Sequence, residues 1–329
     1  MDRLKKEKKK IIIALLFPLS IVIGILLANV SYVYSLINKI DTVELNKDKL
    51  GISDNIEAGM ATEKNHIKNI ALLGVDSVDG AKGRSDTVMI ATIDTEHKKL
   101  KLTSIMRDTY VSIPGRQNDK LNHAYAYGGP ELSIQTLNQN FDLNIDDFVS
   151  VNFSTLPKIV DKLGGISIDV DTEELKYIND YIDHLNSING TNAAHITNSG
   201  EQTLNGTQAM AYCRIRYTDG GDFKRTERNR EVLIKMFNKM CTVSPIDLPD
   251  IIEEMLPMVQ TSMEPFEILD LAKSTLKMAP ELTIEQQRIP MDGYCRDKMI
   301  NGVYYLTFDK DITVQKIHDY IFEESKEGV

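Results

Sequence analysis

Arginine is concentrated in one short stretch of an otherwise acidic chain. The segment RIRYTDGGDFKRTERNR covers residues 214–230, whereas the whole chain of 329 residues has a formal net charge of −10. Guanidinium groups gathered at one place repel one another unless an anion binds among them, and their planar shape suits phosphate. The alternative is a solvated charged run, but such runs are usually rich in lysine. We therefore predict a site for a phosphate-containing ligand here.

The spacing of these arginines indicates which of them share a face. Arg214 and Arg216 are separated by one residue, so both project from the same side if the segment is extended. Arg225 and Arg228 are three residues apart and share a helical face near the start of a helix, where the helix dipole adds positive potential. The glycine pair between the two groups lets the backbone approach a ligand closely. Arg230 is expected to be solvated.

Two aspartates lie close together in the stretch GVDSVDGAKGRSDTVMI. Asp76 closes one apolar run and Asp86 opens the next, so the two approach each other if the runs are neighbouring strands. Two adjacent carboxylates repel unless a cation or a proton lies between them. Mg²⁺ prefers oxygen ligands and would relieve this repulsion, especially with phosphate oxygens. The alternative is that both are solvated turn residues.

A third cluster follows the next predicted strand. SIMRDTYVSIPG places Arg107 and Asp108 at the end of that strand, where the sites of layered α/β proteins often lie. A purely structural Arg–Asp pair is the alternative. KLNHAYAYGG follows and contains Lys120 and His123. A lone histidine beside aromatic residues is more often a packed residue than an acid or a base.

Charge and missing motifs exclude several classes of function. The sequence contains no P-loop GxxxxGK[ST], no clean GxGxxG and no GxSxG, so it supports neither a nucleotide cofactor nor a hydrolase serine. The acidic body argues against nucleic acid as a partner, because nucleic-acid binding needs many phosphate-neutralising cations. The chemistry that remains is phosphoryl transfer by positioning and charge neutralisation.

Strands and helices must alternate to position these clusters. Short apolar runs such as IKNIALLGVD, TVMIATID and KLKLTSIM are typical of strands, and the last two form a predicted hairpin. STLPKIVDKLGG and RTERNREVLIKMFNKM are typical of helices, and QTLNGTQAMAYCRIRY predicts a helix followed by a strand. This interspersed order predicts a layered α/β domain. Residues 171–200 are polar and are predicted to form a mobile loop or lid.

The first 30 residues predict a membrane anchor. Residues 1–10 hold six Lys/Arg and two acids, a net of +4, and residues 11–30 contain no charged residue. Twenty apolar residues span roughly 30 Å of hydrocarbon as a helix, and the basic start places the N-terminus in the cytoplasm. The weak cleavage signal argues against a cleaved signal peptide. We expect a single-pass protein of the cell membrane, with a stem at 31–66 and an extracytoplasmic domain at 67–329.

Four motifs in sequence order resemble the LytR–CpsA–Psr family. They are GRSDTVMIATID, SIMRDTYVSIPG, KLNHAYAYGG and RIRYTDGGDFKRTERNREVL, and the resemblance covers residues 67–240. It implies an α/β/α domain with a central mixed sheet and a hydrophobic groove for a polyprenyl tail. It also implies a membrane-anchored, Mg²⁺-dependent phosphotransferase of cell wall biogenesis, typical of Gram-positive bacteria. Such an enzyme moves a glycopolymer, for example teichoic acid or capsule, from undecaprenyl pyrophosphate to peptidoglycan.

The resemblance also implies roles for individual residues. Asp76 and Asp86 correspond to the magnesium ligands and, with Arg84 and Arg107, to the catalytic set. The implied pyrophosphate-binding residues are Arg84, Arg107, Lys120, Arg214, Arg216, Arg225 and Arg228, and the implied supporting residues are Asp108 and Asp222.

The chain departs from the family at position 229 and in the segment 171–200, which is polar and idiosyncratic and is expected to tune the choice of acceptor or polymer, and some assignments stay open. Position 229 is asparagine where the family commonly has glutamine. Residues 205–213 and 231–240 are candidate walls for the lipid tail, with ordinary core packing as the alternative. Two other functions also stay open: a non-catalytic polyprenyl-phosphate sensor or attenuator of envelope gene expression, and a lipid-linked pyrophosphatase. A sensor needs the arginines but gains little from paired carboxylates.

Overall fold

The computed structural model describes residues 35, 39–56, 58, 66–76, 83–244 and 247–322. The predicted membrane span at 11–30 lies outside these residues. Within the described part of the chain, no helix combines the length and the apolar character needed to cross a bilayer.

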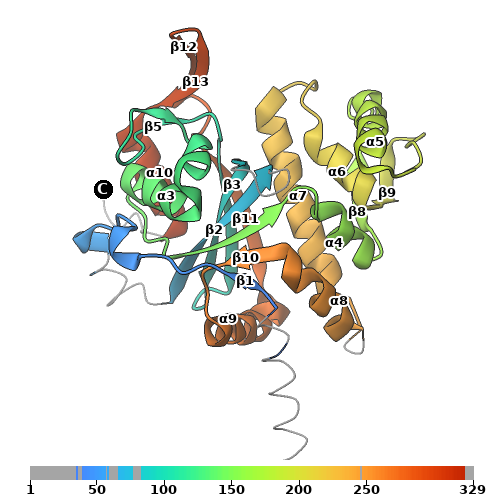
Figure 1. The fold of residues 1–329 in the computed structure, drawn as a ribbon, viewed down its shortest axis with the longest axis horizontal. Coiled ribbons are helices and arrows are strands. Elements are labelled where there is room, and N and C mark those ends of the chain that lie inside the picture. The colour runs from blue at the N-terminus through green and yellow to red at the C-terminus, as the bar shows by residue number, and fades with distance from the viewer. Residues whose placement is uncertain are drawn as a thin grey trace, which may run out of the picture.

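A mixed β-sheet forms the centre of the domain (Figure 1). β2 (Ile67–Asp76) and β3 (Arg84–Asp94) are antiparallel, as are β3 and β4 (Lys99–Ile105). β7 (Asp147–Asn152) runs parallel to β2, and β11 (Thr283–Ile289) runs parallel to β4. The predicted mixed sheet and the predicted β3–β4 hairpin are therefore confirmed. In spatial order, the seven strands found among the described residues are β1 (Asp41–Thr42), β10 (Val259–Thr261), β7 (Asp147–Asn152), β2 (Ile67–Asp76), β3 (Arg84–Asp94), β4 (Lys99–Ile105) and β11 (Thr283–Ile289).

Helices cover both faces of this sheet (Figure 1). The longer helices are α3 (His123–Phe141), α4 (Leu156–Lys162), α5 (Leu175–Asn189), α6 (Gly206–Arg214), α7 (Gly221–Cys241), α8 (Leu248–Met255), α9 (Pro265–Met278) and α10 (Lys310–Ile321). Short 3-10 turns are η1 (Lys47–Lys49), η2 (Leu256–Met258) and η3 (Ala279–Glu281).

The alternation of side chains along β2 separates two apolar layers. Leu73 and its odd-numbered neighbours face the main core, which is closed by α3 and α10. Leu72 faces the opposite side, towards α9 and α7. Because successive residues of a strand point to opposite faces, one continuous apolar run serves both layers.

A second apolar core lies beside the sheet. Ile178 and Ile182 of α5 pack there against Met210 of α6 and Ile168 of β8. The strands of this part are β8 (Ile166–Val170) and β9 (Gly200–Leu204), and the other two-stranded pairs are β5 (Tyr110–Val111) with β6 (Asp119–Lys120) and β12 (Cys295–Ile300) with β13 (Val303–Phe308). The β12–β13 hairpin projects from the body of the domain (Figure 1).

Two predicted segments differ from the structure. Residues 171–200 were predicted to form a mobile loop or lid, but they contain the four-turn helix α5, whose apolar face is buried. The stem predicted at 31–66 is in part integral to the domain, because β1 pairs with β10, and Leu45 and Leu50 are buried in the main core. A strand of two residues carries too little periodicity to be predicted from sequence.

Candidate functional site

A β-bulge places the two aspartates at one end of the sheet. The register pairs Gly74 with Thr87 but Val75 with Ser85, so Asp86 has no partner residue across the strand pair. An extra residue of this kind bends the strand and redirects its side chain. Asp76, two residues beyond Gly74, lines the same polar pocket as Asp86. The predicted proximity of the two carboxylates therefore follows from strand pairing plus the bulge.

Arginines from two other elements complete this pocket. Arg214 is the last residue of α6, Arg216 follows it by two residues, and Arg225 lies in the second turn of α7. All three line a polar pocket of about 280 Å³ together with Asp76 and Asp86. The strand predicted after α6 is wrong, because the chain there is irregular. The two arginines nevertheless reach the same pocket.

Local sequence fixes where α6 and α7 start. Asn205 and Gln208 form a capping box at the start of α6, in which each side chain accepts a hydrogen bond from the other residue's backbone N–H. Gly220 and Gly221 have φ values of 88° and 50°, a left-handed conformation that favours glycine. These two features set the positions of Arg214 and Arg225 relative to the sheet.

Asp86 and Arg107 form an ion pair beside the polar pocket: Asp86 lines that pocket, whereas Arg107 lines a smaller neighbouring pocket together with Asp86 and Arg225. Arg107 Nη1 lies 2.9 Å from Asp86 Oδ2, and Asn122 Nδ2 donates to Asp86 Oδ1 at 3.1 Å. Burial acts to raise the pKa of Asp86, but the Arg107 charge and the hydrogen bond from Asn122 outweigh it and hold that pKa below its usual value. Asp86 is therefore a carboxylate at neutral pH.

Asp222 joins the arginines to one another. Its Oδ2 accepts a hydrogen bond from Arg225 Nη2 at 3.0 Å, and its Oδ1 lies 3.6 Å from Arg107 Nη2 and 3.9 Å from Arg216 Nε. Burial lowers the pKa of Arg225 to about 10, and the charges of Arg107 and Arg216 act in the same direction while Asp222 opposes them. A bound anion would relieve this crowding of positive charge.

Among the residues that line the polar pocket, two buried polar atoms have no hydrogen-bond partner within the described chain. They are Nε of Arg225 and Oδ1 of Asn229, whose Nδ2 donates to Thr87 Oγ1 at 3.0 Å. Buried polar atoms are usually paired, so unpaired ones in a pocket are typical of a ligand site. Asn229, the position that departs from the family pattern, lines the polar pocket itself.

Arg228 and Arg230 are both buried, in contrast to their predicted roles as a ligand-binding residue and a solvated residue. Arg228 is 4% exposed and uses its guanidinium within the protein, since Nε bonds Glu174 Oε1 at 2.6 Å, Nη1 bonds the Ile215 carbonyl and Nη2 bonds Thr218 Oγ1. The structure therefore assigns Arg228 to holding α7 against the preceding loop. Arg230 was expected to be solvated but is 6% exposed and donates to Gln286 of β11.

The remaining predicted residues lie around the pocket. Arg84 is exposed and lies opposite Asp76 in the strand register, but it is not among the residues that line the polar pocket. Lys120 Nζ donates to Asp108 Oδ1 at 2.6 Å, and Asp108 Oδ2 lies 3.5 Å from Arg107 Nε. Lys120 and Asp108 thus extend the charge network behind Arg107 and do not line the polar pocket. His123 Nδ1 lies 2.8 Å from Asp119 Oδ2.

Sequence reasoning missed two pocket residues on α5. Tyr181 and His184 both line the polar pocket, and they come from the segment that was predicted to be a loop. The spacing of Leu175, Ile178 and Ile182 at intervals of three and four residues is the signal that predicts this helix.

An apolar pocket adjoins the polar one. It has a volume of about 170 Å³ and lies between the sheet, α4 and α7, where Leu72 and Met89 face Ile159 and Leu233. The two pockets share four lining residues: Thr87, Phe153, Cys213 and Asn229. The walls that were predicted for a lipid tail, 205–213 and 231–240, contribute Cys213, Val232, Leu233 and Met236.

Gly74 lies against two of the residues that line both pockets. A Cβ atom at this position would lie 2.9 Å from Thr87 Cβ and 3.0 Å from Phe153 Cζ. Both neighbours belong to the shared lining, so a side chain at position 74 would displace residues that line both pockets.

Known proteins are similar to this chain in sequence and in fold. The LytR_cpsA_psr family model matches residues 30–319. The polyisoprenyl-teichoic acid–peptidoglycan teichoic acid transferase TagU of Bacillus licheniformis is 32% identical over 323 residues, 94% of this chain and 96% of that protein. TagU of Bacillus subtilis (strain 168) is 32% identical over 311 residues, 93% of this chain and 94% of that protein.

The fold is shared with solved structures as well. A structure of TagT bound to LIIa-WTA superposes with a TM-score of 0.62 at 27% identity, and the match covers 78% of this chain and 90% of that one. The match of the family model and the two TagU proteins confirm the family that the four motifs predict. The chain belongs to the LytR–CpsA–Psr family.

Proposed function

We propose that this protein is a membrane-anchored phosphotransferase that moves a glycopolymer from a polyprenyl pyrophosphate carrier to peptidoglycan. The donor is the undecaprenyl-pyrophosphate-linked glycan, and the acceptor is a muramic acid hydroxyl of peptidoglycan. We propose teichoic acid as the class of polymer, because the relatives are named teichoic acid transferases.

The observation that carries this proposal is the junction of the two pockets. A polar pocket lined by Arg214, Arg216 and Arg225 adjoins an apolar pocket, with Thr87 and Asn229 in both linings. A lipid carrier has the matching form, an anionic pyrophosphate head joined to a hydrocarbon tail. Apolar contacts supply affinity for the tail, whereas a few placed cations fix the head.

The comparisons support the same reaction. The curated relatives at 32% identity are named as teichoic acid transferases acting on peptidoglycan. The TagT structure at 27% identity holds LIIa-WTA. These names describe those proteins, and we extend them to this chain because the chain carries both the arginines and the adjoining apolar pocket.

Asp76 and Asp86 fit a Mg²⁺ ion. Both carboxylates line the polar pocket, and carboxylate oxygens are the ligands Mg²⁺ prefers when substrate phosphates complete its coordination. Each Asp86 oxygen accepts one protein hydrogen bond or ion pair and retains a further lone pair. When bound, Mg²⁺ would neutralise pyrophosphate charge.

The side chains of the site have separate proposed roles in the reaction. Arg214, Arg216 and Arg225 would hold the pyrophosphate, and Arg107 would stabilise the charge that develops as the undecaprenyl phosphate leaves. The acceptor oxygen forms a bond to phosphorus while the phosphoanhydride bond to undecaprenyl phosphate breaks. Because its pKa is lowered, Asp86 is a poor proton acceptor. We therefore assign the acceptor hydroxyl proton to Asp76, which is exposed at the end of β2.

We further propose that the domain acts at the outer face of the cytoplasmic membrane. The charge-free segment 11–30 behind six N-terminal cations supports a single-pass anchor with its N-terminus in the cytoplasm. A lipid-linked donor would then be presented to the domain in the plane of the bilayer.

The proposal is tested with the full-length chain in detergent, a lipid-pyrophosphate-linked glycan, Mg²⁺ and peptidoglycan oligomers. A product that contains both the glycan and the peptidoglycan sugars supports transfer. Release of free phosphorylated glycan, with no joined product, indicates a pyrophosphatase instead. Donor binding without turnover indicates a lipid-phosphate sensor and contradicts the proposed activity.

A further inference from the structure

Two histidines and one aspartate converge at the end of the sheet opposite to the arginine pocket. His66 directly precedes β2, and Asp94 is the last residue of β3. The antiparallel register places Ile67 opposite Asp94, and both Thr95 N and Thr95 Oγ1 bond the His66 carbonyl at 3.0 Å. His97 follows in the β3–β4 turn, so strand pairing brings all three side chains together.

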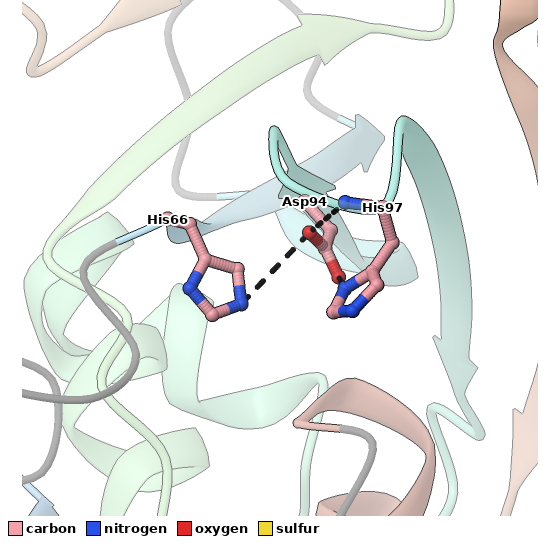
Figure 2. Close-up of side chains that lie close together, drawn as sticks. All are labelled: His66, Asp94 and His97. Carbon is pink, nitrogen blue, oxygen red and sulfur yellow. Dashed lines mark hydrogen bonds and ion pairs between the residues drawn. The ribbon is translucent and has the colours of Figure 1, made fainter.

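Figure 2 shows the three side chains turned towards a common point. His97 Nδ1 lies 2.7 Å from Asp94 Oδ2, and His66 Nε2 lies 3.9 Å from Asp94 Oδ1. One ligand atom from each residue lies within 4.8 Å of the others. Ligands of a tetrahedral zinc ion are separated by about 3.3 Å, given bond lengths of about 2.0–2.1 Å. Small rotations of the exposed His97 side chain would bring the three donors to that separation.

The neighbouring contacts hold the ligands in the required orientation. Asp94 is fully buried, and its Oδ1 accepts hydrogen bonds from the backbone N–H groups of Glu96 and His97 at 3.1 and 2.9 Å. His66 Nδ1 lies 3.3 Å from Glu96 Oε2. A carboxylate on one nitrogen of a metal-binding histidine fixes its tautomer and directs the other nitrogen to the metal. Here that other nitrogen, His66 Nε2, faces Asp94.

We propose that His66, Asp94 and His97 form a binding site for one zinc-type divalent metal ion. Two imidazole nitrogens with one carboxylate oxygen suit Zn²⁺ and other late transition metals, whereas Mg²⁺ and Ca²⁺ favour all-oxygen sites. A cation also compensates for the buried charge of Asp94. The site is therefore chemically distinct from the pair of carboxylates in the polar pocket.

Its place in the fold assigns this metal a structural role. Asp76 is the last of the ten residues of β2 and His66 precedes the first, which corresponds to about 30 Å along a strand. At that distance the metal touches neither pocket. It links the residue that precedes β2 to the last residue of β3 and to the β3–β4 turn, and so fastens the start of β2 to the neighbouring strand.

The test measures Zn²⁺ binding to the untagged, full-length chain in detergent, with excess Mg²⁺ present to occupy oxygen-ligand sites. The variants are His66→Ala and His97→Ala. The matched control is His195→Ala, because His195 Nε2 pairs with Asp183 Oδ1 at the same 2.7 Å but has no third ligand among the described residues. Co²⁺ serves as a second probe, since its visible spectrum reports four-coordinate binding.

We expect one Zn²⁺ per chain for the wild type and for His195→Ala. Each of the two ligand variants should bind at least about 100-fold more weakly, because even outer-sphere partners of a metal contribute 10- to 100-fold. Saturating Zn²⁺ should raise the Tm of the wild type by about 5 °C or more, and it should leave the Tm of His66→Ala unchanged. Absence of stoichiometric Zn²⁺ binding by the wild type, or unaltered affinity in both ligand variants, would overturn the proposal.

Discussion

Asp86 Oδ2 and Arg107 Nη1 lie 2.9 Å apart, although the two residues come from the start of β3 and from just beyond the end of β4. Antiparallel pairing of these strands brings the two positions to the same edge of the sheet, and the bulge directs Asp86 towards the pocket. This ion pair joins the carboxylates of the site to its arginines. Both the stability of the fold and the proposed reaction therefore depend on the charges of these two side chains.

Replacing Asp86 by asparagine should make stability less dependent on pH. The folded-state pKa of Asp86 is lowered, so its stabilising effect is fully present above the unfolded pKa of about 4 and is lost as pH falls through the folded pKa. At pH 7 without metal, Asp86→Asn should be less stable by roughly 1–3 kcal/mol, since Arg107 loses a charged partner.

Urea unfolding at pH 7 and at pH 3 measures this effect. The difference in free energy of unfolding between wild type and Asp86→Asn should narrow at the lower pH. A difference that is the same at both pH values would contradict the assigned ion pair.

Arg228→Ala should damage the fold more than the site. Removing this guanidinium leaves Glu174 buried without its charged partner, at an expected cost of roughly 3–5 kcal/mol in unfolding free energy. The matched control is Lys224→Ala on the same helix, whose ion pair with Glu227 is exposed and should contribute less than about 1 kcal/mol. Equal stability of the two variants in urea would show that Arg228 is not the structural anchor described above.

The strongest sequence patterns predicted the sheet correctly, for a physical reason. β2, β3 and β4 are buried, so their apolar runs are long and stand out from the polar segments around them. β1 and β9 are short and partly exposed, and they carry no such pattern. α5 was missed because its polar residues dominate the composition, although its buried residues keep helical spacing.

The site was predictable where strand order alone determines it. Asp76, Asp86 and Arg107 lie at strand ends, and strand pairing brings them to the same edge of the sheet, where the bulge then directs Asp86 towards the pocket. The sequence did not predict that Arg225 lines the pocket while Arg228 is buried in the protein. Arg225 bonds the nearby Asp222, whereas Arg228 bonds Glu174, which lies 54 residues away in sequence. The sequence signals that residues share a helical face, but it does not identify the partners that the fold brings to each one.

Leu233→Gln should weaken binding of the lipid tail. Leu233 lies on α7 in the wall of the apolar pocket, and an amide there would be desolvated by a hydrocarbon tail. We expect about a tenfold loss of affinity for a polyprenyl phosphate, equivalent to about 1.4 kcal/mol.

The matched control for this change is Leu271→Gln. Leu271 is also half-buried on a helix that covers the same side of the sheet, but it packs in the cluster around α9. Titration of both full-length variants with a fluorescent polyprenyl phosphate distinguishes them. If both lose affinity equally, the apolar pocket is not the site of the tail.

Chelation should abolish transfer, and Mg²⁺ alone should restore it. The reason is that two carboxylates and a pyrophosphate in one pocket need a hard cation. Asp76→Asn should raise the Mg²⁺ concentration needed for half-maximal transfer by at least about tenfold. The measurement is the initial rate of transfer against Mg²⁺ concentration after treatment with EDTA. Full activity in the presence of EDTA would contradict a metal at Asp76 and Asp86.

The most direct test of the central claim is the single-turnover rate of glycopolymer transfer by Arg107→Ala at saturating donor. Arg116→Ala is the control, because Arg116 is exposed and stacks on Tyr127 away from the pocket. Loss of one charge-stabilising donor in a pre-formed site should slow the step by about 100- to 1,000-fold, with folding verified by the Tm. A folded Arg107→Ala variant that transfers at the wild-type rate would contradict the assignment of this pocket as the centre of the reaction.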